Sequence, residues 1–345
     1  MQTGRFLVER VRADPGLVLV VGGPDTGKST FVLELARMLF VAGLATAIVD
    51  TDTGQSDLGP PGTIAMARVR GPVARWSELS PDAAFFVGAT SPPGVEATFL
   101  AGIWRMVEAA RQSGAIAVVV NTTGLIHGPY GRYLKGAKLE GLRPRHLVAL
   151  QRAGEVEHLL RAYPDTSTSR IWRLAVPPGV QRKDREYRRA AREEGYRRAM
   201  EGGSLRVLDL ASVRCLRTRY RTGERLDDAA CRALELRLGT GVVYAERAAD
   251  GIYAVVPGSP PSRPVLMDRS RVYAVSQSAY DQLQVGLLDG RGELAGTGVL
   301  EGLDFAGGKA RVYTPVEVAV TGLVFGTTRV TRDGRELGRL RPKEI

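Results

Sequence analysis

Residues 22–30 read Gly-Gly-Pro-Asp-Thr-Gly-Lys-Ser-Thr and stand between the apolar run 17–21 and a helical pattern over 31–40. They fit the Walker A pattern G-x-x-x-x-G-K-[ST] in the strand–loop–helix context that the pattern requires. In such a loop the backbone N–H groups surround phosphates at a helix N-terminus, so the segment predicts a site for a nucleoside triphosphate. The residues predicted to hold the nucleotide are Gly23, Pro24, Asp25, Thr26, Gly27, Lys28, Ser29 and Thr30.

Two acidic residues follow the next apolar run, 45–49. We expect Asp50 and Asp52 to lie at the carboxyl end of this strand, at the sheet edge where α/β proteins bind ligands. Their spacing places both on one face of the strand, so they can divide two tasks: ordering the water shell of a metal ion and accepting a proton from a nucleophile. Lys28 would then contact the β- and γ-phosphates, and the Ser29 hydroxyl would bind Mg²⁺.

Apolar runs alternate with helical patterns through the first half of the chain, which predicts an α/β fold: a P-loop NTPase parallel sheet with helices on both faces. Beyond Gly203, short strands and glycine turns predict a small β-rich domain with one amphipathic helix. The predicted domains are therefore 1–203, including an arginine-rich segment at about 180–201, and 204–345. The predicted strands lie at 16–21, 45–49, 85–87, 115–120, 146–150 and 171–176, and the predicted helices at 28–42, 95–113, 182–198 and 227–238.

Composition narrows the class of protein. The chain has 345 residues, which is enough for two domains or one large one, and its 44% of hydrophobic residues is ample for a core; its net charge is +11. Clustered cations favour a polyanionic partner, because binding releases counterions condensed on a phosphate backbone. The two cysteines have no metal-binding spacing, the N-terminus has no signal-peptide pattern, and no run of about 18 apolar residues occurs, so we expect a cytoplasmic protein without a membrane partner.

Four ordered motifs resemble a known family, the polynucleotide 5′-hydroxyl kinases of RNA processing, which include the messenger-RNA 3′-end cleavage-factor kinase and the nucleolar ribosomal-RNA-processing kinase. The loop 25–30 is similar to the family's D-x-G-K-S-T, and Asp50, Asp52, Gly54 and Gln55 are similar to its D-x-D-x-G-Q. Residues 86–94 resemble the F-V-G-x-T-S-P-x-G stretch, and residues 120–128 resemble the V-N-T-x-G-W-x-x-G stretch, called the clasp. The arginine-rich segment corresponds to the family's lid, while the N-terminal β-sandwich of the eukaryotic members has no counterpart before the first strand.

The resemblance implies a role for each matching residue. Lys28 would clamp the phosphates, Ser29 would bind Mg²⁺, Asp52 would be the base for the 5′-hydroxyl, and Asp50 would act on the metal through water. The lid would supply charge around the γ-phosphoryl group, from Arg188, Arg192 and either Arg182 or Lys183, since one extra residue leaves that register open. The residues implied in binding the acceptor are Asp52, Gln55, Thr122, Gly124, Leu125 and His127.

One departure concerns the clasp, where Leu125 replaces the family's tryptophan. A leucine offers no ring on which the terminal base can stack, so we expect RNA and DNA 5′ ends to be accepted with little regard to the first base. Of the three histidines, we expect His146 and His158 to be structural and His127 to approach the substrate.

The function predicted from these features is transfer of the γ-phosphate of ATP or GTP to the 5′-hydroxyl of single-stranded RNA or DNA. Two alternatives stay open: an RNA-processing scaffold that binds a triphosphate with little turnover, and a switch-type ATPase or GTPase. The base-reading motif N-K-x-D of guanine-specific switches is missing, because Asn121 is followed by threonine. The sequence does not decide between ATP and GTP, between RNA and DNA, or among protein partners.

Overall fold

The structure, a computed structural model, describes residues 2–163 and 165–340. The chain divides into two compact units, Met1–Gly195 and Tyr196–Ile345, each with its own apolar core. The boundary expected from the sequence follows Gly203, in the turn after the charged helix, whereas the division in space falls inside that helix.

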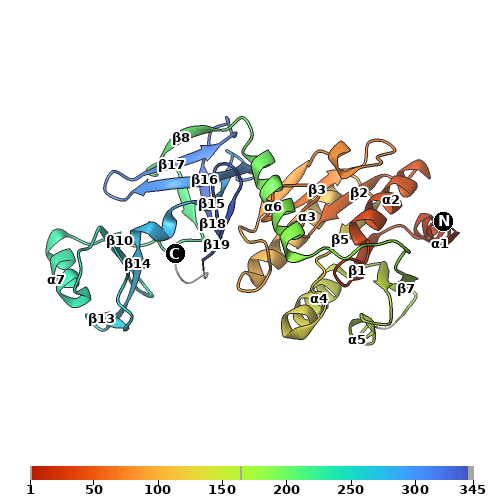
Figure 1. Ribbon diagram of the computed structural model, residues 1–345, viewed down its shortest axis with the longest axis horizontal. Helices are drawn as coiled ribbons and strands as arrows, with labels where there is room; N and C mark the ends of the chain where they lie inside the picture. Colours follow the sequence, from red (N-terminus) through yellow and green to blue (C-terminus); the bar gives the residue numbers. More distant parts are fainter. Residues whose placement is uncertain (1, 164, 341–345) are drawn as a thin grey trace. The chain divides into compact units, whose positions relative to one another are not determined.

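The first unit is a mixed seven-stranded sheet with helices on both faces (Figure 1). Its strands are β1 (Leu17–Gly22), β2 (Thr46–Asp50), β3 (Thr63–Arg68), β4 (Ala83–Phe86), β5 (Ala117–Asn121), β6 (His146–Gln151) and β7 (Arg170–Ala175). Its helices are α1 (Gln2–Ala13), α2 (Lys28–Val41), α3 (Glu96–Gln112), α4 (Gly128–Leu142), α5 (Glu157–Leu160) and the first part of α6 (Arg185–Ala199), with a 3-10 turn η1 (Trp76–Glu78). The strand order is β4-β3-β2-β5-β1-β6-β7.

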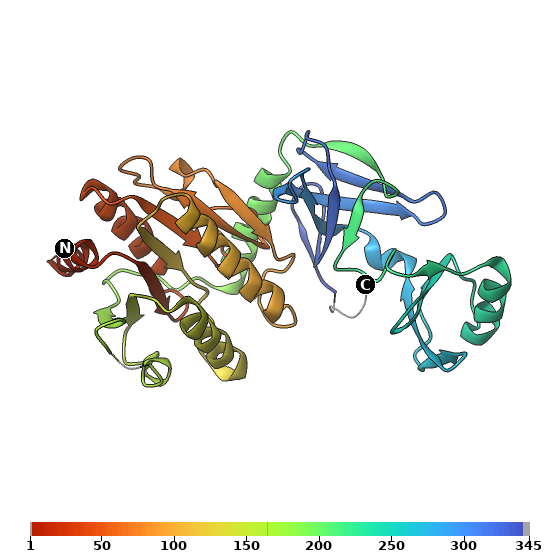
Figure 2. The same ribbon diagram turned by 180° about the vertical axis from the view of Figure 1, so that it is seen from behind.

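Strand β1 lies inside this sheet, between β5 and β6, and all six of its residues are buried. Because successive side chains point to opposite faces, Leu19 and Val21 join one core with α3 and α4, while Val18 and Val20 join the other with α1 and α2. Figure 2 shows α3 and α4 in front of the sheet. The prediction of a sheet covered on both faces is confirmed, and the phosphate loop starts where its buried strand ends.

The sheet differs from the predicted parallel one at a single strand. β3 pairs antiparallel with both β2 and β4, whereas β2, β5, β1, β6 and β7 are parallel neighbours. The sequence analysis missed β3 because its short buried run follows Pro60-Pro61-Gly62, which favours a loop. It also missed α1 and α4.

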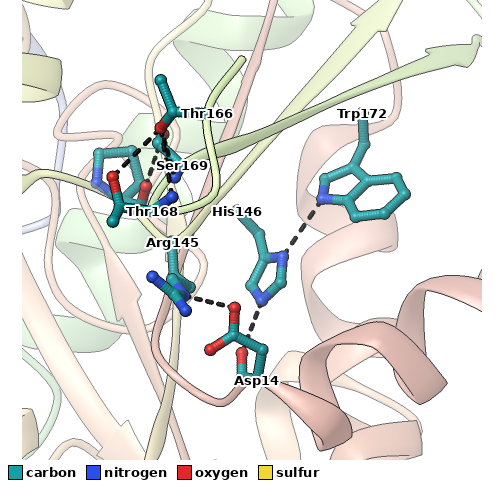
Figure 3. Close-up of polar contacts among 8 residues, drawn as sticks. Asp14, Arg145, His146, Thr166, Thr168, Ser169 and Trp172 are labelled. Atoms are coloured by element: carbon teal, nitrogen blue, oxygen red, sulfur yellow. Dashed lines mark hydrogen bonds and ion pairs between the residues drawn. The ribbon is translucent and has the colours of Figure 1, made fainter. Parts of the chain in front are cut away.

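The amino-terminal edge of the sheet is held by a polar network around His146 (Figure 3). The Trp172 indole N–H donates to His146 Nδ1 at 3.2 Å, and His146 Nε2 lies 2.9 Å from the backbone oxygen of Asp14. The ring is therefore the neutral tautomer with its proton on Nε2. Arg145 forms an ion pair with the Asp14 carboxylate, so the turn that precedes β1 is tied to β6. The prediction that His146 is structural is confirmed.

The second unit is built from β-sheets and one longer helix. A five-stranded sheet has the order β10-β11-β12-β14-β13, and a larger sheet has the order β19-β18-β15-β16-β17-β8 with β9 beside β18. The strands are β8 (Ser204–Asp209), β9 (Arg214–Leu216), β10 (Glu224–Arg225), β11 (Tyr244–Ala248), β12 (Gly251–Val256), β13 (Val265–Met267), β14 (Ser270–Ser276), β15 (Leu283–Leu288), β16 (Leu294–Asp304), β17 (Lys309–Thr314), β18 (Gly322–Val330) and β19 (Glu336–Arg339), with α7 (Asp228–Leu238) and η2 (Gln277–Tyr280).

Strands β11 and β12 form a hairpin, in which they pair antiparallel with Ala248 opposite Gly251. The predicted amphipathic helix is α7, capped by the Asp227 carboxylate, which accepts from the Ala230 N–H at 2.8 Å. Both cysteines are free thiols and half-buried. Within residues 2–163 and 165–340, the structure contains no helix with the length and apolar character needed to cross a membrane.

Candidate active site

The phosphate loop links β1 directly to α2. Gly27, the residue before the helix, has φ = 78°, a left-handed conformation that glycine adopts without strain. Thr26 Oγ1 donates to the Gly23 carbonyl at 3.0 Å and closes the loop on itself. The loop therefore presents its backbone at the start of a 14-residue helix, which is the geometry that binds phosphates.

The Lys28 side chain is buried within this loop. Its ammonium donates to the Gly23 carbonyl at 2.6 Å. Burial lowers the pKa of Lys28 to about 8, and the nearby Asp52 and Asp25 carboxylates oppose that shift. An ammonium held over the loop backbone is placed to meet phosphate oxygens there, as the sequence analysis predicts.

Asp50 is the last residue of β2 and is fully buried. Its Oδ1 accepts from Asn121 Nδ2 at 3.0 Å and from the Asp52 N–H at 3.1 Å, and its Oδ2 accepts from the Asp57 N–H at 2.8 Å. Burial is the main cause that raises the pKa of Asp50 to about 7, and the Asp57 and Asp52 carboxylates add to it. The buried Asp50 carboxylate thus fixes the loop after β2 through its bonds to the backbone of Asp52 and Asp57.

Asp52 lies beyond the end of β2, in the bend that follows. The expectation that both acids share one face of the strand is wrong, because the strand ends at Asp50. Asp52 is half-buried, and its Oδ1 accepts from the N–H groups of Gly54 and Gln55 at 3.2 Å each. The two carboxylates therefore have different surroundings, and of the pair only Asp52 is accessible.

The clasp, residues 120–128, passes over the phosphate loop. A Cβ at Gly124 would lie 2.8 Å from the Cα and the N of Pro24, so only glycine permits this approach. Ile126 is buried, and its Cδ1 would lie 3.3 Å from a Cβ at Gly23. Segments about 100 residues apart in sequence are thereby packed together at the site.

The clasp residues differ in exposure. Leu125 is half-buried and packs against the core of the sheet, while His127 is exposed. The His127 and His158 rings are stacked at 5.8 Å, and His158 Nε2 lies 2.8 Å from the Ile126 carbonyl oxygen. His158 therefore supports the clasp, in line with its predicted structural role.

Thr122 lies in the interior of the protein, whereas a residue that binds the acceptor is expected at the surface. It is fully buried, its hydroxyl donates to the Val20 carbonyl at 2.8 Å, and it accepts from Lys135 Nζ at 2.8 Å. The hydroxyl is used inside the protein, so Thr122 is corrected from a substrate-contacting residue to one that fixes the clasp to β1.

The arginine-rich segment contacts the phosphate loop through Asp25. The Arg188 guanidinium donates to Asp25 Oδ2 at 2.6 Å, and the Lys183 N–H donates to the same oxygen at 3.2 Å. Gln55 Nε2 donates to the Arg188 carbonyl at 3.0 Å and so joins the bend after β2 to α6. Arg188 is thus held at the loop, and Gln55 connects the lid to the segment that carries Asp52.

The other lid cations lie along the same segment. Arg192 is half-buried on α6, whereas Arg182 and Lys183 are exposed and precede the helix. The register of the first lid cation stays open, and the roles of Arg182, Arg188 and Arg192 in transfer stay predictions.

Comparisons with known proteins match the part of the chain that carries these motifs. A family model described as the P-loop of the mRNA cleavage and polyadenylation factor CLP1 matches residues 22–202. The chain belongs to the CLP1 P-loop family. A polyribonucleotide 5′-hydroxyl-kinase of Thermococcus kodakarensis is 34% identical over 333 residues, which cover 96% of this chain and 93% of that protein. One from Pyrococcus horikoshii is 30% identical over 328 residues, covering 94% and 89%.

A solved CLP1 relative has the same fold as this chain. The structure of the wild-type Clp1p–Pcf11p complex matches with a TM-score of 0.61 and 13% identity, over 94% of this chain and 77% of that one. Membership of the CLP1 P-loop family accounts for the order of the phosphate loop, the acidic bend, the clasp and the lid along one chain.

The sequence analysis did not assign three residues to the site that the structure places there. Asn121 donates to Asp50 Oδ1 at 3.0 Å and to Ser29 Oγ at 3.2 Å, and α4 contributes two buried lysines, Lys135 and Lys138. The composition could have pointed to these residues, because both residue types are rare in the chain. It has a single asparagine, and only six of its 48 cationic residues are lysine, at positions 28, 135, 138, 183, 309 and 343.

Proposed function

We propose that this member of the CLP1 P-loop family is a polynucleotide 5′-hydroxyl kinase, which transfers the γ-phosphate of a nucleoside triphosphate to the 5′-hydroxyl of RNA or DNA. The observation that carries the proposal is the contact of the clasp with the phosphate loop at Gly124 and Pro24. This contact packs the clasp, the segment that we propose binds the acceptor, against the phosphate loop. The names of the archaeal relatives support the same activity.

In the proposed reaction, the acceptor's 5′-oxygen attacks the γ-phosphorus and the bond from that phosphorus to the β,γ-bridging oxygen breaks. Asp52 accepts the hydroxyl proton, and the nucleoside diphosphate leaves with the bonding electron pair. The chain contributes alignment and charge: Lys28 at the phosphates and Arg188 from the lid. The remaining lid assignments, Arg192 and either Arg182 or Lys183, belong to the same proposal.

The residues present fit a magnesium ion. Asn121 Nδ2 donates to both Ser29 Oγ and Asp50 Oδ1, and among the described residues the buried Asn121 Oδ1 has no hydrogen-bond partner. Among the residues the structure describes, no group of three His, Cys, Asp or Glu side chains could hold a metal alone, which suits an ion bound through phosphates and water. We assign Ser29 as its direct ligand and Asp50 as a contact through water. When bound, Mg²⁺ would neutralise charge on the phosphates.

The acceptor is expected to bind across the clasp and the bend after β2, at Gln55, Gly124, Leu125 and His127. Because Leu125 packs partly on the core, it offers little surface for stacking a base. RNA and DNA 5′ ends are both proposed acceptors, and ATP and GTP are both proposed donors. A location in the cytoplasm stays a prediction from the sequence.

A transfer assay tests the proposal. The protein is incubated with a γ-labelled triphosphate, each of the four in turn, and a 5′-hydroxyl RNA or DNA oligonucleotide, with the same oligonucleotide carrying a 5′-phosphate as the matched control. We expect label on the 5′-hydroxyl acceptor alone, and none with Lys28→Ala. Hydrolysis without transfer would instead favour a switch ATPase or GTPase, and binding without turnover would favour a scaffold.

A further inference from the structure

Helix α4 carries two lysines whose side chains are buried under the active site. Lys135 and Lys138 are each only 1% exposed and lie three residues apart, on the same face of the helix. Lysine is almost never fully buried unless its charge is paired. In the described part of the chain neither side chain forms an ion pair with a carboxylate; their contacts are neutral oxygens and a ring.

Lys135 holds the end of β5. Its Nζ donates to Thr122 Oγ1 at 2.8 Å and to the Thr123 carbonyl at 2.7 Å. The Thr122 hydroxyl in turn donates to the Val20 carbonyl of β1 at 2.8 Å. Lys135 therefore fixes the first residues of the clasp against the strand that leads into the phosphate loop.

Lys138 holds the end of β2. Its Nζ donates to Thr51 Oγ1 at 3.2 Å and lies 4.7 Å from the centre of the Phe99 ring. Thr51 stands between the two acids of the site, and its hydroxyl donates to the Asn121 carbonyl at 2.7 Å. Through the Thr51 hydroxyl, Lys138 is thus connected to the residue that precedes Asp52 and to the backbone of β5.

Asn121 completes the connection to the phosphate loop. Its amide donates to Asp50 Oδ1 at 3.0 Å and to Ser29 Oγ at 3.2 Å. Two sets of hydrogen bonds therefore start from α4: one runs from Lys138 through Thr51 and Asn121 to Ser29, and the other runs from Lys135 through Thr122 to Val20. The two sets together, formed by Lys135, Lys138, Thr51, Asn121 and Thr122, are called the lysine network below.

Packing alone does not account for these two side chains. A buried ammonium loses its hydration, and an apolar side chain of similar size would fill the same space at lower cost. Burial lowers the pKa of both lysines, while the charges of Asp52 and Asp50 oppose the shift at Lys138. Among 48 cationic residues only six are lysine, and three of these, Lys28, Lys135 and Lys138, are buried in this one region.

We propose that Lys135 and Lys138 are positioning residues of the kinase, which hold Asp52 and the clasp in register with the phosphate loop through the lysine network. The inference rests on the proposed transfer activity. Both side chains are buried and so do not touch the acceptor. Their effect is on alignment, and an error of about 1 Å in a reacting group can lower a rate about 100-fold.

The test uses Lys138→Met and Lys135→Met in the full chain. We expect kcat to fall about 10- to 100-fold, since Asp52 and the clasp lose their support, with the triphosphate KM unchanged. The thermal midpoint should change little, because each substitution removes a desolvated amine but also leaves a buried oxygen without its donor. Arg143→Met is the matched control: it removes an exposed cation at the C-terminal end of the same helix, outside the network, and kcat should not change.

A large fall in rate with little change in the thermal midpoint separates positioning from packing. If either methionine variant keeps the full kcat, that lysine is not a positioning residue, whatever its thermal midpoint. If a variant fails to fold, Thr51→Val breaks the Lys138 link from the other end while keeping the shape of the side chain. A full kcat in Thr51→Val would overturn the role of Lys138, and Thr122→Val tests Lys135 in the same way.

A failure of the proposed function can be distinguished from a failure of this inference. If the wild type transfers no phosphate, the kinase assignment falls. Amide hydrogen exchange then decides the positioning: Lys138→Met should raise exchange in the peptide 50–57 and Lys135→Met in the peptide 121–128, with Arg143→Met as wild type. Unchanged exchange in both peptides would overturn the inference without reference to activity.

Discussion

Asp50 and Asp52 have different surroundings, and this difference supports the roles proposed for them. Asp50 is fully buried and accepts three hydrogen bonds, so its carboxylate cannot reach an acceptor. Asp52 is half-buried beyond the strand end and uses Oδ1 to hold the bend. The residue that can receive a proton from a nucleophile is therefore Asp52.

Asp52→Asn keeps the shape of the side chain and removes the proton acceptor. We expect kcat for transfer to fall by about 10²- to 10⁴-fold, the usual contribution of a general base, while the triphosphate Kd stays close to that of the wild type. Single-turnover transfer and equilibrium binding measure the two quantities separately. A variant that loses triphosphate affinity but keeps its maximal rate would show that Asp52 acts on the metal instead.

His146 links the stability of the first unit to pH. Burial is the main cause that lowers the pKa of His146 below its ordinary value of 6.5; Arg145 adds to it and Asp14 opposes it. Between the lowered pKa and 6.5 the unfolded chain binds more protons than the folded one, so the free energy of unfolding falls as the pH drops through this range.

His146→Gln should remove this part of the pH dependence. A glutamine can accept from the Trp172 indole and donate to the Asp14 carbonyl, but it does not titrate. The free energy of unfolding, measured by denaturant at about pH 8 and about pH 5.5, should fall less with pH in the variant than in the wild type. If the free energy of unfolding falls equally with pH in both proteins, His146 does not titrate in this range.

At the scale of the elements, α6 carries Arg188, which we propose meets charge on the γ-phosphoryl group. Arg188 is anchored at Asp25, its side chain 31% exposed, and Gln55 holds its carbonyl. Arg188→Met should raise the barrier of transfer by about 2–4 kcal/mol with little change in triphosphate binding, because the developing charge of the transition state loses a donor. Rapid-quench kinetics at saturating triphosphate measures the change.

Two further variants define what the lid arginine does. Arg189→Met is the control, because Arg189 is exposed on the same helix and pairs with Glu193 at 3.0 Å. Asp25→Asn removes the anchor without removing the guanidinium. If Asp25→Asn is as slow as Arg188→Met, the arginine acts by closing the lid on Asp25 and does not meet the phosphoryl group itself.

Elements with a strong apolar pattern could be predicted from the sequence, whereas α4 could not. Strand β1 and helix α2 were predicted within one residue at each end because a continuous apolar run and a glycine loop mark them. Helix α4 contains Gly131, Gly136 and Gly141, whose low helix propensity hides the pattern. Two of these glycines are required by packing, since a Cβ at 131 or 141 would lie within 2.6 Å of Ile126 or Trp104.

The same limit applies to the site. Motifs could place the phosphate loop, Asp52 and the clasp, because each depends on neighbours in sequence. The lysine network could not be predicted, since it joins α4 to Thr51 and Asn121 across a sheet whose register is set by tertiary packing. Thr122 was misassigned for a related reason: whether a hydroxyl faces solvent or a buried ammonium is decided by a helix that the pattern does not reveal.

At the scale of the whole molecule, we expect the net charge of +11 to strengthen binding of a polyanionic acceptor. With Leu125 packed partly on the core, the terminal base has little to stack on, and binding must depend more on the phosphates of the strand. For single strands each contacted phosphate contributes a slope of about −0.7 to the logarithm of the binding constant against that of the salt concentration. Acceptor KM should therefore rise steeply between about 50 mM and about 200 mM salt.

Acceptor length provides the internal control for this prediction. A dinucleotide has one internucleotide phosphate, so its KM should respond weakly to salt, and the slope should increase with length until the contacted phosphates are covered. Oligonucleotides that differ only in the first base should give the same KM at each salt concentration. A KM that ignores salt, or that depends strongly on the first base, would mean that an exposed ring such as His127 or Tyr130 stacks on the terminal base in place of the missing tryptophan.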